Sequence, residues 1–139
     1  MVQTTRVKER QAAQAQRIKQ AQAFLVPDHI DVAILGGGAA GLCAAITAAE
    51  ALGANKRVVV FEKALESGRT ILATGGGRCN FTNANLSFEN FSNPEFVQAV
   101  CKDKDTFLAD ILSFFRSSGL AWATEDEDRM YPLTRQASS

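Results

Sequence analysis

The sequence predicts an α/β fold built on a pair of parallel strands, because three suitable segments follow one another. The apolar run 32–35 has the length of a short strand buried on both faces. A glycine-rich turn and the helix-forming run 42–52 come next, and the apolar run 58–61 has the composition of a second strand. A strand, a helix and a strand in this order make a βαβ unit, whose two strands are parallel.

The turn after the first strand contains the pattern G-x-G-x-x-G, with Gly36, Gly38 and Gly41 at its fixed positions. The first glycine allows the tight turn, the second lets the backbone approach a pyrophosphate, and the third lets helix and strand pack closely. The unpaired N–H groups at the helix start, aided by the helix dipole, then face the phosphates. The pattern therefore predicts a phosphate-binding turn.

An acidic residue lies where a dinucleotide site needs one. Glu62 follows the second apolar run and lies 21 positions after Gly41. The motif requires an acid about 20 residues on, at the tip of the second strand, to bind a ribose hydroxyl. The glycine pattern alone is weak evidence, but strand, turn, helix, strand and acid all occur in order. We therefore interpret this region as a dinucleotide site and not as a tight turn without a ligand.

The composition of the 139 residues narrows the class of protein. An apolar content of 46% suits about one folded domain. Fifteen basic residues balance fifteen acidic ones, which argues against nucleic acid or an anionic membrane as a partner. The sequence has no apolar run long enough to span a bilayer and no signal-peptide core. Three cysteines without C-x-x-C spacing suit a reducing compartment, so we expect a cytoplasmic protein.

Residues 1–29 are predicted to form a Gln-rich, basic extension in front of a domain at 30–139. Range 1–27 has six glutamines and five Lys or Arg residues against a single acid. We favour a solvated helical or frayed extension over a transit peptide, because serine is absent, and Pro27 would end any helix at about Val26. His29 has no evident partner in the sequence, and we assign it no catalytic role.

A second glycine-rich segment follows the βαβ unit. Gly75, Gly76 and Gly77 precede Arg78 and Asn80. Backbone of this kind can approach a flat or anionic ligand closely, and the two polar side chains supply hydrogen-bond donors. From composition alone, ligand contact and an ordinary loop are about equally supported.

The C-terminal half predicts helices and a hairpin. Range 81–93 is a polar loop, and Pro94 then starts a short helix that ends at about Cys101. An apolar stripe over 107–115 predicts a core-facing helix capped by Gly119. The ranges 120–124 and 129–133 predict the two strands of a hairpin. We interpret the acidic range between them, 125–128, as a solvated turn and not as a metal site.

The sequence resembles the bacterial BaiN-like flavoproteins, also described as aminoacetone oxidase family or NAD(P)/FAD-dependent oxidoreductases. The resemblance lies in range 68–83, which reads Gly-Arg-Thr-Ile-Leu-Ala-Thr-Gly-Gly-Gly-Arg-Cys-Asn-Phe-Thr-Asn. Its specific part is Gly-Arg-Cys-Asn-x-Thr-Asn, and ranges 114–120 and 128–133 are similar to that family too. The resemblance runs from about Asp31 to the C-terminus and leaves out the Gln-rich extension.

The resemblance implies the N-terminal part of a Rossmann-type FAD-binding domain with a helix and β-hairpin insertion, which we expect to be truncated. It implies FAD instead of NAD, with pyrophosphate on the first glycine turn, the adenosine ribose on Glu62, and Arg69 and the loop 75–80 beside the pyrophosphate and flavin. The residues that we expect to contact the cofactor are Gly36, Gly38, Ala39, Ala40, Gly41, Glu62, Lys63, Arg69, Gly75, Gly76, Gly77, Arg78, Cys79 and Asn80.

The activity implied by the resemblance is FAD-dependent oxidoreduction of a small molecule, with hydride transfer at the flavin and NAD(P)H as a candidate donor. Two alternatives stay open, namely an NAD-binding dehydrogenase domain and a truncated remnant without activity. The sequence presents no convincing general acid or base, and Cys79 has no resolving cysteine nearby. The catalytic residues, the substrate and the oligomeric state are therefore left unassigned.

Overall fold

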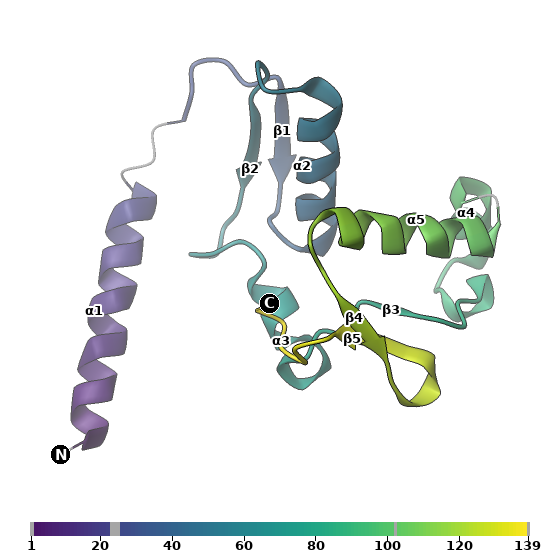
Figure 1. Cartoon of the computed structure of the whole chain (residues 1–139). Helices are drawn as coiled ribbons and strands as arrows, with labels where there is room; N and C mark the ends of the chain where they lie inside the picture. The colour runs from purple at the N-terminus through teal and green to yellow at the C-terminus, as the bar shows by residue number, and fades with distance from the viewer. Residues whose placement is uncertain (1, 23–25, 102, 139) are drawn as a thin grey trace. The chain divides into compact units, whose positions relative to one another are not determined.

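The chain forms two compact units, Met1–Arg69 and Thr70–Ser139, each with its own small sheet (Figure 1). The structure is a computed structural model, and it describes residues 2–22, 26–101 and 103–138. We refer to the two parts as the N-terminal unit and the C-terminal unit. Among the described residues, no helix has both the length and the apolar character that crossing a membrane requires.

The N-terminal unit contains the predicted βαβ arrangement. Strands β1, Val32–Leu35, and β2, Val58–Phe61, pair in parallel, with Val32 opposite Val58 (Figure 1). Helix α2, Ala39–Leu52, packs against both strands. It begins three residues before the predicted start because Gly38 is its N-cap and accepts the first helical hydrogen bond, from the Leu42 N–H at 2.9 Å. The predicted α/β class with a parallel sheet is confirmed.

Burial of β1 differs from the prediction. The run was expected to be buried on both faces, but its residues alternate between half-buried and exposed, and Leu35 is 86% exposed. Within the described residues of this unit, α2 is the helix packed on the two-stranded sheet. A single helix can cover only one face, which accounts for the alternation along β1.

Asp31 joins the starts of the two strands. Its carboxylate accepts hydrogen bonds from the Arg57 N–H and from the Lys56 ammonium, both at 2.9 Å, and its own N–H donates to the Arg57 carbonyl at 3.0 Å. The Arg57 N–H, followed by Lys56, holds the pKa of Asp31 far below its usual range. His29 Nε2 lies 3.4 Å from the same carboxylate, so the prediction that His29 lacks a partner was wrong.

Most of the described part of the N-terminal extension is helical, which is one of the two forms that its composition favours. Helix α1 covers Val2–Gln22, and its described side chains are exposed, including Val7 and Ile18. Val26, where we expected the helix to end, is not helical, and residues 23–25 lie outside the described ranges.

The C-terminal unit has a three-stranded antiparallel sheet in the order β3-β5-β4. The predicted hairpin is formed by β4, Trp122–Thr124, and β5, Arg129–Pro132. Strand β3, Thr82–Asn83, pairs with β5, although the prediction assigned this range to loop. Two residues are too few to show an alternating pattern, so the strand is defined only by its partner.

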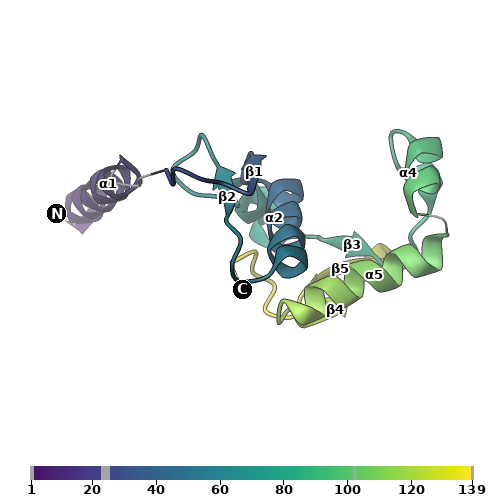
Figure 2. The same cartoon turned by 90° about the horizontal axis from the view of Figure 1, so that it is seen from above.

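Two helices follow β3. Helix α4, Pro94–Cys101, has the predicted bounds, and helix α5, Lys104–Ser117, includes the apolar stripe. Asp103 caps α5 by accepting the Thr106 N–H at 2.8 Å, and Gly119 beyond its end has φ +85°. Figure 2 shows α4 turning away from the N-terminal end of α5. The unpredicted short elements are the helix α3, Arg69–Ala73, and the 3-10 turns η1, Thr74–Gly77, η2, Phe88–Asn90, and η3, Asp126–Asp128.

Aromatic side chains join α5 to the sheet. The ring of Phe81, beside β3, lies 4.8 Å from Phe115 of α5 and 6.1 Å from Trp122 of β4. Met130 and Tyr131 of β5 are buried. Close aromatic pairs of this kind contribute beyond the area that they bury. This cluster gives the C-terminal unit its core and holds the segment around residues 75–83 against the hairpin.

Replacing Asp31 by Asn should lower stability at neutral pH, because the lowered pKa means that folding favours the ionised carboxylate. That contribution is complete above the unfolded-state pKa of about 3.9 and is lost as the pH falls toward the folded-state pKa. The difference in urea midpoint between the native protein and Asp31→Asn should therefore shrink below about pH 4. The exposed Asp28→Asn variant is the control, and an equal effect of both substitutions would contradict the assignment.

Candidate functional site

The glycine turn after β1 has a geometry that side chains would prevent. Gly36 has φ +99°, a left-handed conformation, and its N–H donates to the Phe61 carbonyl at 2.8 Å. A Cβ on Gly41 would collide with the carbonyl oxygen of Gly36 and approach Ile34. The first glycine thus makes the turn, and the third lets α2 pack against the end of β1.

The start of α2 presents unpaired donors. The first helical hydrogen bond comes from Leu42, so the N–H groups of Ala39, Ala40 and Gly41 have no acceptor within the helix. Gly38 offers no side-chain cap, and the first turn contains no acidic residue. Together with the positive end of the helix dipole, these donors suit a pyrophosphate.

Glu62 is bound to the glycine turn. Its Oε2 accepts the Gly37 N–H and its Oε1 accepts the Ala64 N–H, both at 2.6 Å. These bonds, the one from Ala64 first, lower the pKa of Glu62, so the side chain is a carboxylate at neutral pH. Each carboxylate oxygen can accept more than one hydrogen bond. The predicted ribose ligand can therefore hold the turn and still accept a hydroxyl group.

Gly37 belongs to the site, although the sequence prediction left it out. It is buried, and a Cβ there would lie 2.8 Å from Ser67 Cβ and 3.2 Å from the Glu62 carboxylate. Its carbonyl accepts the Gly68 N–H at 2.6 Å, which folds range 62–68 back onto the turn. The available indication was the unbroken Gly-Gly-Gly sequence, one glycine more than the motif requires.

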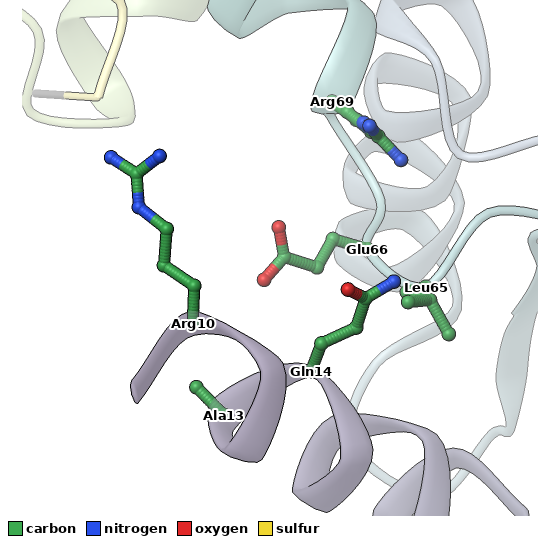
Figure 3. A pocket seen from close by; sticks show the side chains of 6 residues that line it. All are labelled: Arg10, Ala13, Gln14, Leu65, Glu66 and Arg69. Atoms are coloured by element: carbon green, nitrogen blue, oxygen red, sulfur yellow. The ribbon is translucent and has the colours of Figure 1, made fainter. Parts of the chain in front are cut away.

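The other two predicted residues of this unit lie outside the turn. Lys63 is exposed beside Glu62. Arg69 starts α3 and borders an open hollow of about 400 Å³ (Figure 3). The hollow is lined by Arg10, Ala13, Gln14, Leu65, Glu66 and Arg69. No residue of the glycine turn lines it, so the hollow and the turn are separate features of the N-terminal unit.

The second glycine segment, range 75–80, is a left-handed loop in the C-terminal unit. Its three glycines have φ values of +55°, +67° and +88°, and Cys79 has φ +60°. A Cβ on Gly75 would lie 3.1 Å from the Asn80 N and 3.5 Å from the Tyr131 ring. Cys79 is half-buried and donates its N–H to the Thr74 carbonyl at 3.1 Å. The glycines are therefore required by the path of the backbone.

Both polar side chains of this loop have partners within the C-terminal unit. The Asn80 amide nitrogen donates to the carbonyls of Thr82, at 2.9 Å, and Met130, at 3.0 Å. Arg78 pairs with Glu125 at 3.1 Å. The donors that we expected to serve a ligand thus also hold the loop. Beside the loop is a cavity of about 310 Å³ lined by Asn80, Phe81, Thr82, Asn83, Leu86, Ser87, Asn90, Phe91, Phe107 and Ile111.

The acidic segment is less solvated than expected. Glu125 is half-buried because it pairs with Arg78 and Arg135, whereas η3 is exposed. Across the described ranges, no three His, Cys, Asp or Glu side chains are grouped to hold a metal ion. The three cysteines are free and half-buried, and burial raises the pKa of the Cys43 thiol.

Comparison with known proteins decides the family. Residues 30–139 match the HI0933-like protein Rossmann domain. The chain belongs to the HI0933-like family. Its match to the family's Rossmann domain confirms both the predicted Rossmann-type fold and the resemblance predicted from range 68–83.

Three curated relatives of the HI0933-like chain are bacterial proteins. A 3-dehydro-bile acid delta(4,6)-reductase of Clostridium scindens is 38% identical over 110 residues, which are 78% of this chain and 26% of that protein. Ribosomal RNA dihydrouridine synthases of Escherichia coli and Haemophilus influenzae are each 32% identical, over 97 and 100 residues. Those matches cover 68% and 70% of this chain, and 23% and 24% of the relatives. The chain thus spans about a quarter of their length.

Substitution of Gly41 by Ala should destabilise the N-terminal unit, although alanine is the better helix former by about 1 kcal/mol. The new Cβ meets backbone that cannot rotate away, and overpacking of this kind costs about 1–3 kcal/mol. Chemical unfolding of Gly41→Ala measures the net loss.

Gly36→Ala is the matched control, because an added Cβ there meets nothing within 4 Å and the variant tests the positive φ alone. It should cost about 1–2 kcal/mol. A Gly41→Ala protein as stable as the native one would show that the turn and the helix are less closely packed than described.

Proposed function

We propose that this chain is the N-terminal part of the FAD-binding domain of a flavin-dependent oxidoreductase. The observation that supports it most is the arrangement at the end of β1, where unpaired N–H groups of α2 and the Glu62 carboxylate flank one glycine turn. A pyrophosphate requires such donors, and a ribose hydroxyl requires such an acceptor. The two halves of an adenine dinucleotide would thus meet complementary groups.

The residues at the turn can accept the FAD pyrophosphate although the Glu62 carboxylate lies nearby. Backbone N–H groups of Gly37 and Ala64 already bind the Glu62 carboxylate, so the donors of Ala39, Ala40 and Gly41 stay available for phosphate oxygens. Absence of a side chain at Gly38, the second glycine of the pattern, would let the pyrophosphate approach the backbone. When bound, FAD would supply hydride transfer at its flavin ring. The residues described here bind and orient, and none is assigned a proton-transfer role.

The names of the relatives support a reduction. One relative is named a reductase, and two others are named dihydrouridine synthases. We propose that this chain takes part in the same class of reaction, a reduction, with NAD(P)H as the electron donor. We do not extend the substrates of these relatives to it. The balanced charge of the chain gives no reason to extend RNA binding to it. A cytoplasmic location is part of the same proposal.

Titration with FAD tests the proposal directly. Because the chain spans only about a quarter of its relatives' length, the protein should bind FAD weakly in titration, with a change in flavin fluorescence, and should not retain it through purification. Tighter binding of NAD than of FAD would favour an NAD-dependent dehydrogenase domain. A protein that binds neither dinucleotide would overturn the proposed function.

Glu62→Gln should weaken FAD binding about tenfold or more, because a ribose hydroxyl loses its charged acceptor. An FAD analogue without the adenosine 2′-hydroxyl separates this contact from damage to the turn. The analogue should bind the native protein more weakly than FAD does, and Glu62→Gln should remove that preference. Glu50→Gln, on the exposed side of α2, is the control. An unchanged preference for FAD over the analogue in Glu62→Gln would contradict the ribose contact.

A further inference from the structure

Tyr131 is the platform under the second glycine loop. Its side chain is 3% exposed, and the ring edge lies next to Gly75. The Arg78 guanidinium lies over the same ring, 4.5 Å from its centroid, with Nη2 3.5 Å from the Tyr131 hydroxyl. A cation stacked on a ring in this way is attracted by the ring electrons. The buried tyrosine thus lies beside the first glycine of the run and under Arg78, which follows the last one.

Glu125 fixes the guanidinium from the side. Its Oε2 pairs with Arg78 Nη1 at 3.1 Å, and its Oε1 pairs with Arg135 Nε at 2.9 Å. The Glu125 side chain is 20% exposed, so its charge is better shielded from water than that of a surface residue. The Ala137 N–H also donates to the Gly77 carbonyl at 2.9 Å. Range 125–137 therefore holds the loop at several points.

A direct contact between Arg78 and an anion conflicts with this arrangement. Glu125 offsets part of the Arg78 charge, since it shares its carboxylate with Arg135, and both terminal nitrogens of Arg78 face partners of the C-terminal unit. A ligand would have to displace a carboxylate from a stacked arginine. The loop backbone, which the glycines leave bare, has no such obstacle.

We propose that Arg78, Glu125 and Tyr131 are positioning residues that hold loop 75–80 in its left-handed form, so that the loop offers backbone and not the arginine to a ligand. The holding of the loop stands on the contacts alone. Its purpose, to place backbone beside the flavin, rests on the proposed function. Glu125 and Tyr131 lie about 50 residues from the loop in sequence and belong to no binding motif.

Trypsin cleavage after Arg78 measures how firmly the side chain is held, because Arg78 is the only Lys or Arg between Arg69 and Lys102. In Glu125→Gln, cleavage there should be about three- to tenfold faster, as expected when opening becomes easier. Tyr131→Phe keeps the ring and should change the rate by less than about twofold. Glu89→Gln, an exposed acid of the same unit, is the matched control.

Cleavage after Arg116 in α5 and the fluorescence of Trp122 report whether a variant has kept its fold. A variant that loses the fold is replaced by Glu125→Asp, which keeps the charge and should cleave at a rate between those of the native protein and Glu125→Gln. Unchanged cleavage at Arg78 in a folded Glu125→Gln protein would overturn the positioning role.

The FAD dissociation constant gives a second readout with opposite signs for the two roles. If Arg78 binds the cofactor directly, Glu125→Gln frees it and tightens binding. If Arg78 positions the loop, Glu125→Gln and Arg78→Ala both weaken binding, and the double variant is no weaker than the worse single one. Tighter binding in Glu125→Gln would overturn the proposal. Absence of FAD binding by the native protein would defeat the proposed function, whereas the trypsin result would still decide the holding of the loop.

Discussion

The hydrogen bond from the Gly37 N–H to Glu62 is the contact on which the N-terminal unit depends. It ties the end of β2 to the turn that follows β1, and the bond from Ala64 fixes the second carboxylate oxygen. The turn can then pass close to α2, because Gly41 has no side chain to meet the Gly36 carbonyl. The Glu62 carboxylate thus sets the position of the turn, the direction of the free N–H groups of α2 and its own orientation.

The C-terminal unit also fixes a glycine-rich loop, but it does so with several side chains instead of one carboxylate. Its glycine loop has no helix long enough to anchor it, and its backbone is left-handed at four of its positions. Such conformations persist only where the surroundings enforce them. Here the enforcement comes from side chains, with Asn80 bonded to two carbonyls and Arg78 placed between Glu125 and Tyr131.

Local patterns predicted the parts of the structure that depend on neighbours in sequence. The glycine motif and two apolar runs located the βαβ unit, and Pro94 located α4. Strand β3 and the ion pair between Arg78 and Glu125 were not predicted, because their partners lie more than 40 residues away. The exposure of Leu35 was not predicted. A short apolar run indicates that a strand is suited to burial, but it does not indicate which face of the strand other elements cover.

The hydrogen bonds between Asp31 and Arg57 have a consequence for folding during synthesis. Their partners are 26 residues apart, and the β1–β2 pairing has the same short separation. Closing a loop of this size costs less entropy than closing a longer one, by about 0.6 kcal/mol for each halving of loop length. A ribosome synthesises a chain at roughly 5–20 residues per second. The glycine turn, Glu62 and the free N–H groups of α2 can therefore assemble while later segments are still being made. The glycine turn that we propose to bind the dinucleotide would then be among the first structures of the nascent chain.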